Sequence, residues 1–207
     1  MANQTISHYR IIEKLGEGGM GVVYQAEDLK LKRTVALKFL SPQALGSEED
    51  KTRFLREAQA AAALDHPNIC TVHEIDEVDG QTFIVMAFLE GQTLAEKIKA
   101  GPLELDEALE FATQLARGLQ AAHLKGTFHR DIKPANLIIT ESVPSQKLLK
   151  ITDFGLAQLA ERSRLTRPEI TLGTLAYMSP EQTEAAGTDQ RTDLWALGCV
   201  TYEMVSG

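Results

Sequence analysis

Residues 129–136 read His-Arg-Asp-Ile-Lys-Pro-Ala-Asn, and the tripeptide Asp-Phe-Gly follows at 153–155. The two motifs contain three oxygen-bearing side chains and one ammonium: Asp131, Asn136, Asp153 and Lys133. A hydroxyl that attacks phosphorus needs a base beside it, and Mg²⁺ binds hard oxygen ligands. The combination therefore suits phosphoryl transfer, although any one of these aspartates alone is more typical of a helix cap or a turn.

Two further motifs lie earlier in the chain. Residues 16–23 read Gly-Glu-Gly-Gly-Met-Gly-Val-Val, and residues 35–38 read Val-Ala-Leu-Lys. Such glycines are typical of a simple turn, of a dinucleotide-binding turn between a strand and a helix, or of a hairpin that covers phosphates. Residues with high β-propensity lie on both sides, which favours the hairpin, where glycine lets backbone amides approach phosphate oxygens.

Lys38 follows three apolar residues on a predicted strand, so its stem would be partly buried. A solvated lysine is the more common interpretation of such a position taken alone. Glu57 shifts that balance, because it lies on the sheet-facing side of a predicted helix. A carboxylate there needs a partner, since unpaired buried charge is costly.

In this order and spacing, the motifs resemble those of the eukaryotic-type serine/threonine protein kinases. Residues 173–182, Gly-Thr-Leu-Ala-Tyr-Met-Ser-Pro-Glu-Gln, are most similar to bacterial members of that family, and the resemblance extends over residues 9–207. It implies transfer of the ATP γ-phosphoryl group to serine or threonine hydroxyls of proteins, with ATP and Mg²⁺ as the cofactors. Lys133, two residues after Asp131, indicates the serine/threonine class rather than the tyrosine class.

The resemblance also implies a role for each motif residue. Asp131 would accept or orient the substrate hydroxyl, and Lys133 would neutralise charge on the transferred group. Asn136 and Asp153 would hold Mg²⁺. Lys38 would hold the α- and β-phosphates, and Glu57 would position Lys38. The other residues expected to contact ATP lie on the glycine-rich hairpin, the next strand and the segment that joins the lobes: Leu15, Gly16, Gly18, Gly21, Val23, Ala36, Met86, Ala87 and Leu89.

Arg130 adds a prediction about regulation. Kinases with arginine before the catalytic aspartate typically pair it with a phosphorylated residue of the activation loop, which here would span 153–181. Thr166 and Thr171 are the candidate phosphosites, reached by autophosphorylation, whereas Thr174 resembles a structural hydroxyl. His129 and Phe154 are expected to pack the loop against the core.

The hydrophobic pattern predicts a small sheet with one helix, followed by a helical part. Strands are expected at 9–15, 21–27, 34–40, 69–78 and 82–88, with a helix at 48–64. Helices at about 105–125 and 189–204 flank a hairpin at 137–140 and 148–152. The predicted fold class is α+β: a protein-kinase-like bilobal domain over residues 1–207, with a small antiparallel N-lobe at 9–90 and a mainly helical, incomplete C-lobe at 91–207.

The composition limits the function classes. A net charge of −8 over 207 residues argues against a nucleic-acid partner, which would require a basic face. Cys70 and Cys199 stand far apart and are typical of reduced thiols rather than a disulfide or metal site. Neither a signal peptide nor an apolar run of transmembrane length is evident, so we expect a cytoplasmic location without a membrane segment in this chain.

The family resemblance predicts further helices beyond residue 207, so we expect a fragment of a kinase domain. Asp193, at the start of the final helix, would brace the backbone of the catalytic loop. Five apolar residues of that helix would lack part of their cover and are expected to expose a patch suited to self-association: Leu194, Trp195, Leu197, Val200 and Met204. The alternatives are a catalytically impaired, pseudokinase-like scaffold that binds nucleotide or a partner, and a small-molecule kinase, which is disfavoured because residues 179–181 suit the docking of a polypeptide.

Overall fold

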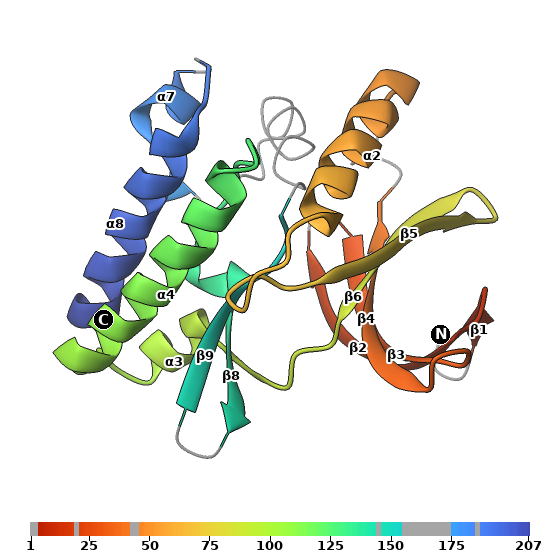
Figure 1. Ribbon diagram of the computed structural model, residues 1–207, viewed down its shortest axis with the longest axis horizontal. Helices are drawn as coiled ribbons and strands as arrows, with labels where there is room; N and C mark the ends of the chain where they lie inside the picture. Colours follow the sequence, from red (N-terminus) through yellow and green to blue (C-terminus); the bar gives the residue numbers. More distant parts are fainter. Residues whose placement is uncertain (1–3, 19–20, 42–45, 144–145, 155–174, 185–186) are drawn as a thin grey trace.

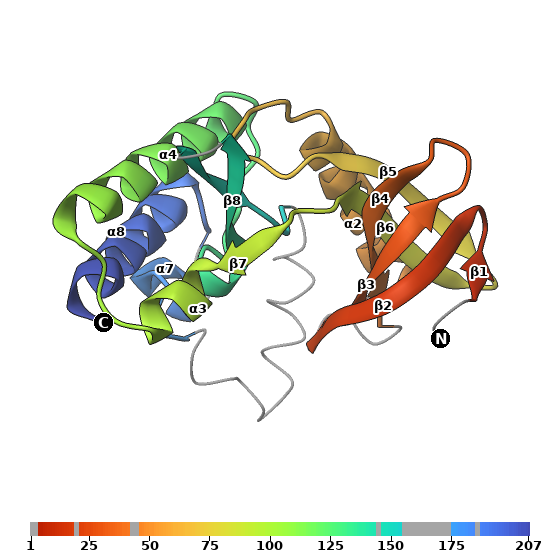
Figure 2. The same ribbon diagram turned by 90° about the horizontal axis from the view of Figure 1, so that it is seen from below.

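The computed structural model describes residues 4–18, 21–41, 46–143, 146–154, 175–184 and 187–207. These residues form two lobes: a curled antiparallel sheet with one helix, and a mainly helical part (Figures 1 and 2). This is the α+β bilobal architecture that the sequence predicts. Within the described ranges, no helix combines the length and the apolar character needed to cross a membrane.

The first lobe is built on a six-stranded sheet with the order β1-β2-β3-β4-β6-β5. Its strands are β1 (Thr5–Ile6), β2 (Tyr9–Gly18), β3 (Gly21–Asp28), β4 (Arg33–Leu40), β5 (Val72–Val78) and β6 (Gln81–Ala87). Alternate residues of a strand face opposite sides of a sheet. On β4, Val35, Leu37 and Phe39 pack into the core on one side, while Ala36 and Leu40 pack against the helix on the other. The alternation therefore places Lys38 on the helix side.

The helix of this lobe is α2 (Glu48–Ala62). Its N-terminus has a capping box, in which the Ser47 side chain accepts from the Asp50 backbone and the Asp50 side chain accepts from the Ser47 backbone. Three acidic residues in its first turn complement the positive end of the helix dipole. Phe54, Ala58 and Ala61 are buried, and Phe54 and Ala58 share a cluster with residues of β4 and β6.

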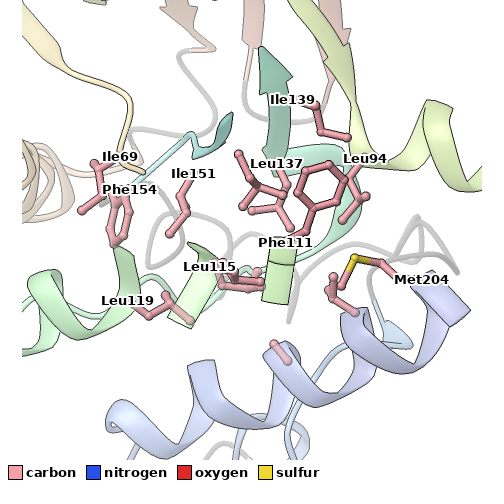
Figure 3. Packing of buried hydrophobic residues seen from close by; sticks show 14 of the residues in the cluster. Ile69, Leu94, Phe111, Leu115, Leu119, Leu137, Ile139, Ile151, Phe154 and Met204 are labelled. Atoms are coloured by element: carbon pink, nitrogen blue, oxygen red, sulfur yellow. The ribbon is translucent and has the colours of Figure 1, made fainter. Parts of the chain in front are cut away.

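The second lobe contains a three-stranded sheet, β7-β8-β9, and the longer helices. The strands are β7 (Gly91–Thr93), β8 (Leu137–Val143) and β9 (Gln146–Ile151), and the helices are α3 (Leu94–Lys99), α4 (Leu105–His123), the short 3₁₀ turn η1 (Pro134–Asn136), α7 (Pro180–Thr183) and α8 (Gln190–Ser206). In both overall views α4 and α8 lie side by side (Figures 1 and 2). Apolar residues of α4, β8, β9 and α8 form one core, in which Phe111, Leu115, Ile151 and Met204 are almost fully buried (Figure 3). The expectation that Val200 and Met204 lack cover is wrong, because both face this core, whereas Leu194 and Trp195 of the same helix are exposed.

The segment between α2 and β5 fastens the two lobes together. The Cys70 amide donates to the Ile151 carbonyl at 2.8 Å, and the Ile151 amide donates to the Asn68 carbonyl at 2.9 Å. Gly118 of α4 packs against the same place, where a Cβ atom would lie only 2.7 Å from Ile151 Cδ1. The end of β9, which leads directly to Asp153, is thereby fixed against both lobes.

Candidate active site

A buried aspartate of α8 holds the backbone of the loop at 129–131. The Asp193 carboxylate accepts from the His129 amide at 2.9 Å and from the Arg130 amide at 2.7 Å, and His123 Nε2 lies 2.7 Å from Oδ2. Burial alone would raise the pKa of Asp193, but these hydrogen bonds hold it below its usual value. The bracing role predicted for Asp193 is confirmed.

The loop has a second, internal support in His129, which is fully buried. Its Nδ1 accepts from the Asp131 amide at 3.2 Å, and its Nε2 lies 2.8 Å from the Thr152 carbonyl oxygen. This pair of contacts assigns the proton to Nε2. The Phe154 ring packs edge-on against the imidazole, with ring centroids 4.7 Å apart. His129 and Phe154 therefore pack the loop, as the sequence predicts.

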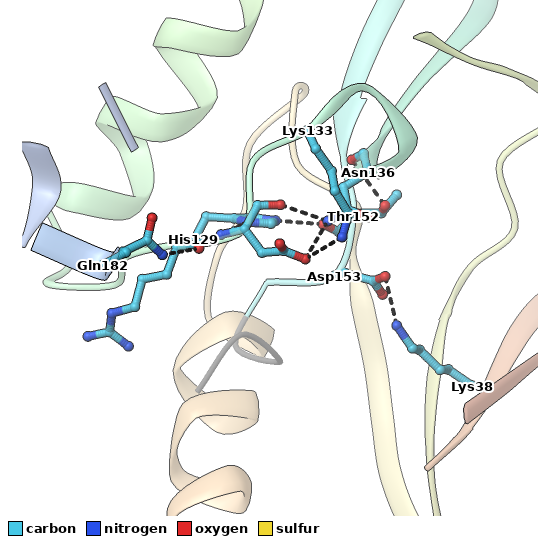
Figure 4. Close-up of polar contacts among 9 residues, drawn as sticks. Lys38, His129, Lys133, Asn136, Thr152, Asp153 and Gln182 are labelled. Atoms are coloured by element: carbon cyan, nitrogen blue, oxygen red, sulfur yellow. Dashed lines mark hydrogen bonds and ion pairs between the residues drawn. The ribbon is translucent and has the colours of Figure 1, made fainter. Parts of the chain in front are cut away.

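Two of the predicted catalytic side chains, Lys133 and Asn136 (Figure 4), donate to the third, Asp131. Lys133 Nζ lies 2.9 Å from Asp131 Oδ2, and Asn136 Nδ2 lies 3.2 Å from the same oxygen. Asn136 Nδ2 also donates to the Asp131 carbonyl oxygen at 2.8 Å. The Asp131 side chain is 8% exposed, so its carboxylate is held by these donors at the edge of solvent.

Asp153 lies close to this group and faces the first lobe. The preceding residue, Thr152, donates from its amide to the Asn136 carbonyl at 2.9 Å, which ties the end of β9 to the loop. Asp153 has a left-handed backbone with φ of 64°, a conformation that is uncommon outside glycine and is held here by its surroundings. Its Oδ2 lies 2.7 Å from Lys38 Nζ, and the Lys38 side chain is 7% exposed.

The structure pairs Glu57 differently from the prediction. Both Lys38 and Glu57 are described, and no ion pair joins them; Glu57 Oε1 instead lies 3.7 Å from Arg130 Nη1. The physical reason is that the Asp153 carboxylate already neutralises the buried Lys38 ammonium, so this ammonium does not need Glu57 as a partner, and the Glu57 carboxylate lies near the Arg130 guanidinium instead. The expected Lys38–Glu57 pair is therefore absent from this arrangement of the two lobes.

Most of the residues expected around adenine share one apolar cluster. Ala36 and Met86 are buried in it, and Val23, Ala87 and Leu89 pack against it partly buried. Leu15 lies outside this cluster and is 45% exposed. The Ala87 amide donates to the Thr71 carbonyl at 2.9 Å, and the Ala87 carbonyl accepts from Cys70 Sγ at 3.6 Å, which leaves one lone pair of that carbonyl for a ligand.

The glycine-rich motif joins two antiparallel strands, because Gly16 pairs with Val23 and Gly18 with Gly21 across β2 and β3. This excludes the strand-to-helix arrangement of a dinucleotide-binding turn. At Gly21, where φ is +144°, a Cβ atom would lie 1.8 Å from the Phe39 carbonyl oxygen, so the sheet itself requires glycine. At Gly16 and Gly18 a Cβ atom would meet no described residue within 4 Å, so packing within the described part of the chain does not explain these two glycines.

Some predictions fall on residues outside the described ranges, namely Thr166, Thr171, Thr174 and Gly155. Within those ranges there is no group of three or more His, Cys, Asp or Glu side chains arranged to hold a metal ion. Cys70 is buried, and burial raises the pKa of its thiol to about 12. It is therefore a protonated thiol at neutral pH.

Residues 9–207 match the family model described as "Protein kinase domain". The chain is a member of the protein kinase family. It is 40% identical, over 96% of its length, to the serine/threonine-protein kinase PrkC of Bacillus subtilis. It is also 37% identical, over its full length, to the serine/threonine-protein kinase PknJ of Mycobacterium tuberculosis. It covers 30% and 35% of these two relatives, so it spans about a third of their length.

The fold of the kinase domain agrees with solved structures. The crystal structure of the Mycobacterium tuberculosis PknI kinase domain superposes with a TM-score of 0.81 at 31% identity, and the match covers 99% of this chain and 76% of that one. The two sequence relatives and the PknI structure all come from bacteria, as the similarity of residues 173–182 to bacterial kinases predicts.

Sequence reasoning missed three polar residues that hold this kinase site together. His123 contacts Asp193, Thr192 Oγ1 donates to Glu181 Oε1 at 2.9 Å, and Gln182 Nε2 donates to the Arg130 carbonyl oxygen at 2.8 Å. Two of these residues had a signal in the sequence: His123 lies in the last turn of an amphipathic helix, and Thr192 is a polar residue beside Asp193. Nothing in the local sequence indicates that Gln182 reaches a residue so distant along the chain.

Proposed function

We propose that this chain is the catalytic domain of a protein serine/threonine kinase that transfers the γ-phosphoryl group of ATP to serine or threonine hydroxyls of proteins. The proposal rests on the position of the Lys38–Asp153 ion pair, which lies beside a hydrogen-bonded cluster (Figure 4). That cluster consists of Asp131, Lys133 and Asn136. Cations and oxygen ligands are thereby arranged around a carboxylate base. Phosphoryl transfer depends mainly on such positioning and charge stabilisation.

Asp131 is proposed as the group that accepts or orients the proton of the substrate hydroxyl. The donors at its Oδ2, from Lys133 and Asn136, fix the orientation of the carboxylate before substrate arrives. Lys133 also brings a positive charge beside the point of attack, where negative charge builds up on the transferred group. The buried Lys38 ammonium is proposed to bind the α- and β-phosphates of ATP.

The residues present fit a magnesium ion. Mg²⁺ is commonly held by one or two side-chain oxygens together with substrate phosphates, so a large cluster of protein ligands is not required. Asp153 supplies a carboxylate, and Asn136, which bonds Asp131 through Nδ2, retains Oδ1 as a cation ligand. When bound, the ion would neutralise phosphate charge and polarise the transferred group.

ATP is proposed to lie between the glycine-rich hairpin and the apolar cluster. No described residue would crowd a Cβ atom at Gly16 or Gly18, and glycine there allows the backbone to approach phosphates closely. Val23, Ala36, Met86 and Leu89 supply apolar surface for adenine. The Ala87 amide is engaged by Thr71, so the adenine amino group is proposed to donate to the Ala87 carbonyl through the lone pair that Cys70 Sγ does not use.

The proposal is tested by transfer of radiolabelled phosphate from ATP to a protein acceptor. Asp131→Asn should lower the rate by roughly 10²- to 10⁴-fold, the usual contribution of a general base, while ATP binding is retained. Asp106→Asn removes an exposed aspartate from the first turn of α4 and should behave like the wild type. Equal incorporation by Asp131→Asn and the wild type would refute the assigned base.

A second function, nucleotide binding without transfer, is favoured by one observation. Active kinases require the lysine–glutamate pair, whereas Glu57 here contacts Arg130. The same assay separates the two: a scaffold binds ATP with a measurable Kd but incorporates no phosphate into any acceptor. Phosphate transfer by the wild type would exclude the hypothesis of a non-catalytic scaffold.

We further propose autophosphorylation at Thr166 or Thr171. It is supported by Arg130, whose Nε is buried and has no hydrogen-bond partner among the described residues, so that the guanidinium retains capacity for an anion. Mass spectrometry after incubation with Mg-ATP should find phosphate on one of the two threonines, and Asp131→Asn should abolish it. Finding neither site phosphorylated in an active wild type would contradict this proposal.

A further inference from the structure

Gln182 links two parts of the second lobe that are 52 residues apart in the sequence. It lies in α7, and the two ends of its side-chain amide have different partners. The Oε1 atom accepts from the Ser179 amide at 3.1 Å and thus caps its own short helix. The Nε2 atom donates to the Arg130 carbonyl oxygen at 2.8 Å, outside that helix (Figure 4).

The acceptor belongs to the peptide unit that carries Asp131. A peptide group is planar, so the Arg130 carbonyl and the Asp131 amide turn together. That amide donates to His129 Nδ1 at 3.2 Å, which means that Gln182 and His129 hold the two edges of one plane. The orientation of this plane determines the direction in which the Asp131 side chain leaves the backbone.

Arg130 is also a conformational weak point of the loop. Its φ of 61° lies in the left-handed region, which a non-glycine residue keeps only where its surroundings hold it. Asp193 of α8 accepts from its amide at 2.7 Å, and Gln182 of α7 donates to its carbonyl. The peptide units before and after this residue are therefore each fixed by a different helix.

The helix that carries Gln182 is anchored to the same place on α8. Glu181 accepts from Thr192 Oγ1 at 2.9 Å, and the buried Ser179 and Thr192 hydroxyls lie 3.4 Å apart. Thr192 is the neighbour of Asp193, so α7 and the loop are both fastened to the first turn of α8. The Gln182–Arg130 hydrogen bond adds a direct link between α7 and the loop, so α7, α8 and the loop are each connected to the other two.

We propose that Gln182 is a positioning residue: it fixes the Arg130–Asp131 peptide plane, and a displacement of α7 is transmitted through it to the base. This inference rests on the proposed kinase function. It predicts that the two ends of the Gln182 amide have separable effects, with Oε1 serving helix stability and Nε2 serving turnover.

Gln182→Glu separates the two ends. Glutamate keeps the acceptor and completes a Ser-x-x-Glu capping box, so the melting temperature should stay within about 2 °C of the wild type. Its second oxygen cannot donate and faces the Arg130 carbonyl oxygen, which turns the bridge into a repulsion. We expect kcat for a peptide acceptor to fall by about 10- to 100-fold, with the KM for ATP unchanged.

Two further variants control this experiment. Gln120→Glu makes the same change at an exposed position of α4 and should leave kcat and the melting temperature unaltered. Gln182→Met removes both ends of the amide at similar volume, so it should lower kcat and the melting temperature together. A kcat of Gln182→Glu equal to that of Gln120→Glu in an active kinase overturns the inference.

Amide hydrogen exchange distinguishes this failure from failure of the proposed function. If the wild type transfers no phosphate, the kinase proposal fails, and the exchange rate of the Asp131 amide still reports whether Gln182 holds the peptide plane. Faster exchange at Asp131 in Gln182→Glu, but not in Gln120→Glu, supports the positioning role. Unchanged exchange in that case overturns it.

Discussion

The ammonium of Lys38 lies 2.7 Å from Oδ2 of Asp153, and this ion pair joins β4 of the sheet lobe to the end of β9 in the helical lobe. The two partners differ in burial: the side chain of Lys38 is 7% exposed and that of Asp153 is 26% exposed. The pair is thus a buried cation neutralised by a carboxylate that retains contact with solvent. Substitution of Lys38 and substitution of Asp153 should therefore lower the free energy of unfolding by different amounts.

Asp153→Asn should destabilise the fold more than Lys38→Met. Loss of the carboxylate leaves a buried ammonium uncompensated, which we expect to lower the free energy of unfolding by about 2–4 kcal/mol. Loss of the ammonium leaves a carboxylate that water can solvate and replaces a buried charge by an apolar side chain, at a cost of about 1 kcal/mol or less. Urea denaturation measures both, and the reverse order would contradict the asymmetry.

Glu57→Gln should change turnover without changing stability. The Glu57–Arg130 contact is long, at 3.7 Å, and both side chains retain some exposure, so its loss should alter the free energy of unfolding by less than about 1 kcal/mol. If turnover requires Glu57 to move to Lys38, kcat should fall at least tenfold. The control is Glu13→Gln, at an exposed position of β2. An unaltered kcat would show that turnover does not require Glu57 to pair with Lys38.

Alanine substitutions in the glycine-rich hairpin should separate folding from nucleotide binding. Gly21→Ala places a Cβ atom against the Phe39 carbonyl in a backbone that disfavours side chains, so it should lower the free energy of unfolding by about 2 kcal/mol or more. Gly18→Ala meets open space and should leave stability within about 0.5 kcal/mol while raising the KM for ATP. Equal melting temperatures of the two variants would contradict this assignment.

Long periodic elements of the fold were predictable from the sequence, and short ones were not. The helices expected at about 105–125 and 189–204 are α4 (Leu105–His123) and α8 (Gln190–Ser206). The strand β7 and the helices α3 and α7 are too short to show a period, and their formation depends on partners such as β8. One local signal was available at α3, the capping box of Thr93 and Glu96.

The candidate site shows a similar division. Motif spacing identified Asp131, Lys133 and Asn136, and these residues lie together because they belong to one tight loop. Partners from different elements were less predictable, since Glu57 lies within reach of Arg130 only through the relative placement of the two lobes. The exposed position of Leu15 has the same origin, because spacing along a strand does not determine how far its end is covered.

Asp193 should make the fold sensitive to acid. Its pKa in the folded chain lies below the usual value, because hydrogen bonds from His123 and the loop amides outweigh the effect of burial. The unfolded chain, with an aspartate pKa of about 3.9, therefore binds the proton more readily than the folded chain does. The stabilisation is fully present above about pH 4 and is lost as the pH falls through the lower folded pKa.

Asp193→Asn tests this coupling, because asparagine cannot titrate and its amide group cannot accept from all three donors. The variant should be less stable than the wild type at pH 7, and the difference should narrow below about pH 4, when the wild type also loses its carboxylate charge. Chemical denaturation between pH 3 and pH 7 measures the effect, with Asp106→Asn, an exposed aspartate of α4, as the matched control. A difference that stays constant over this range would show that Asp193 supports the loop by shape alone, without its charge.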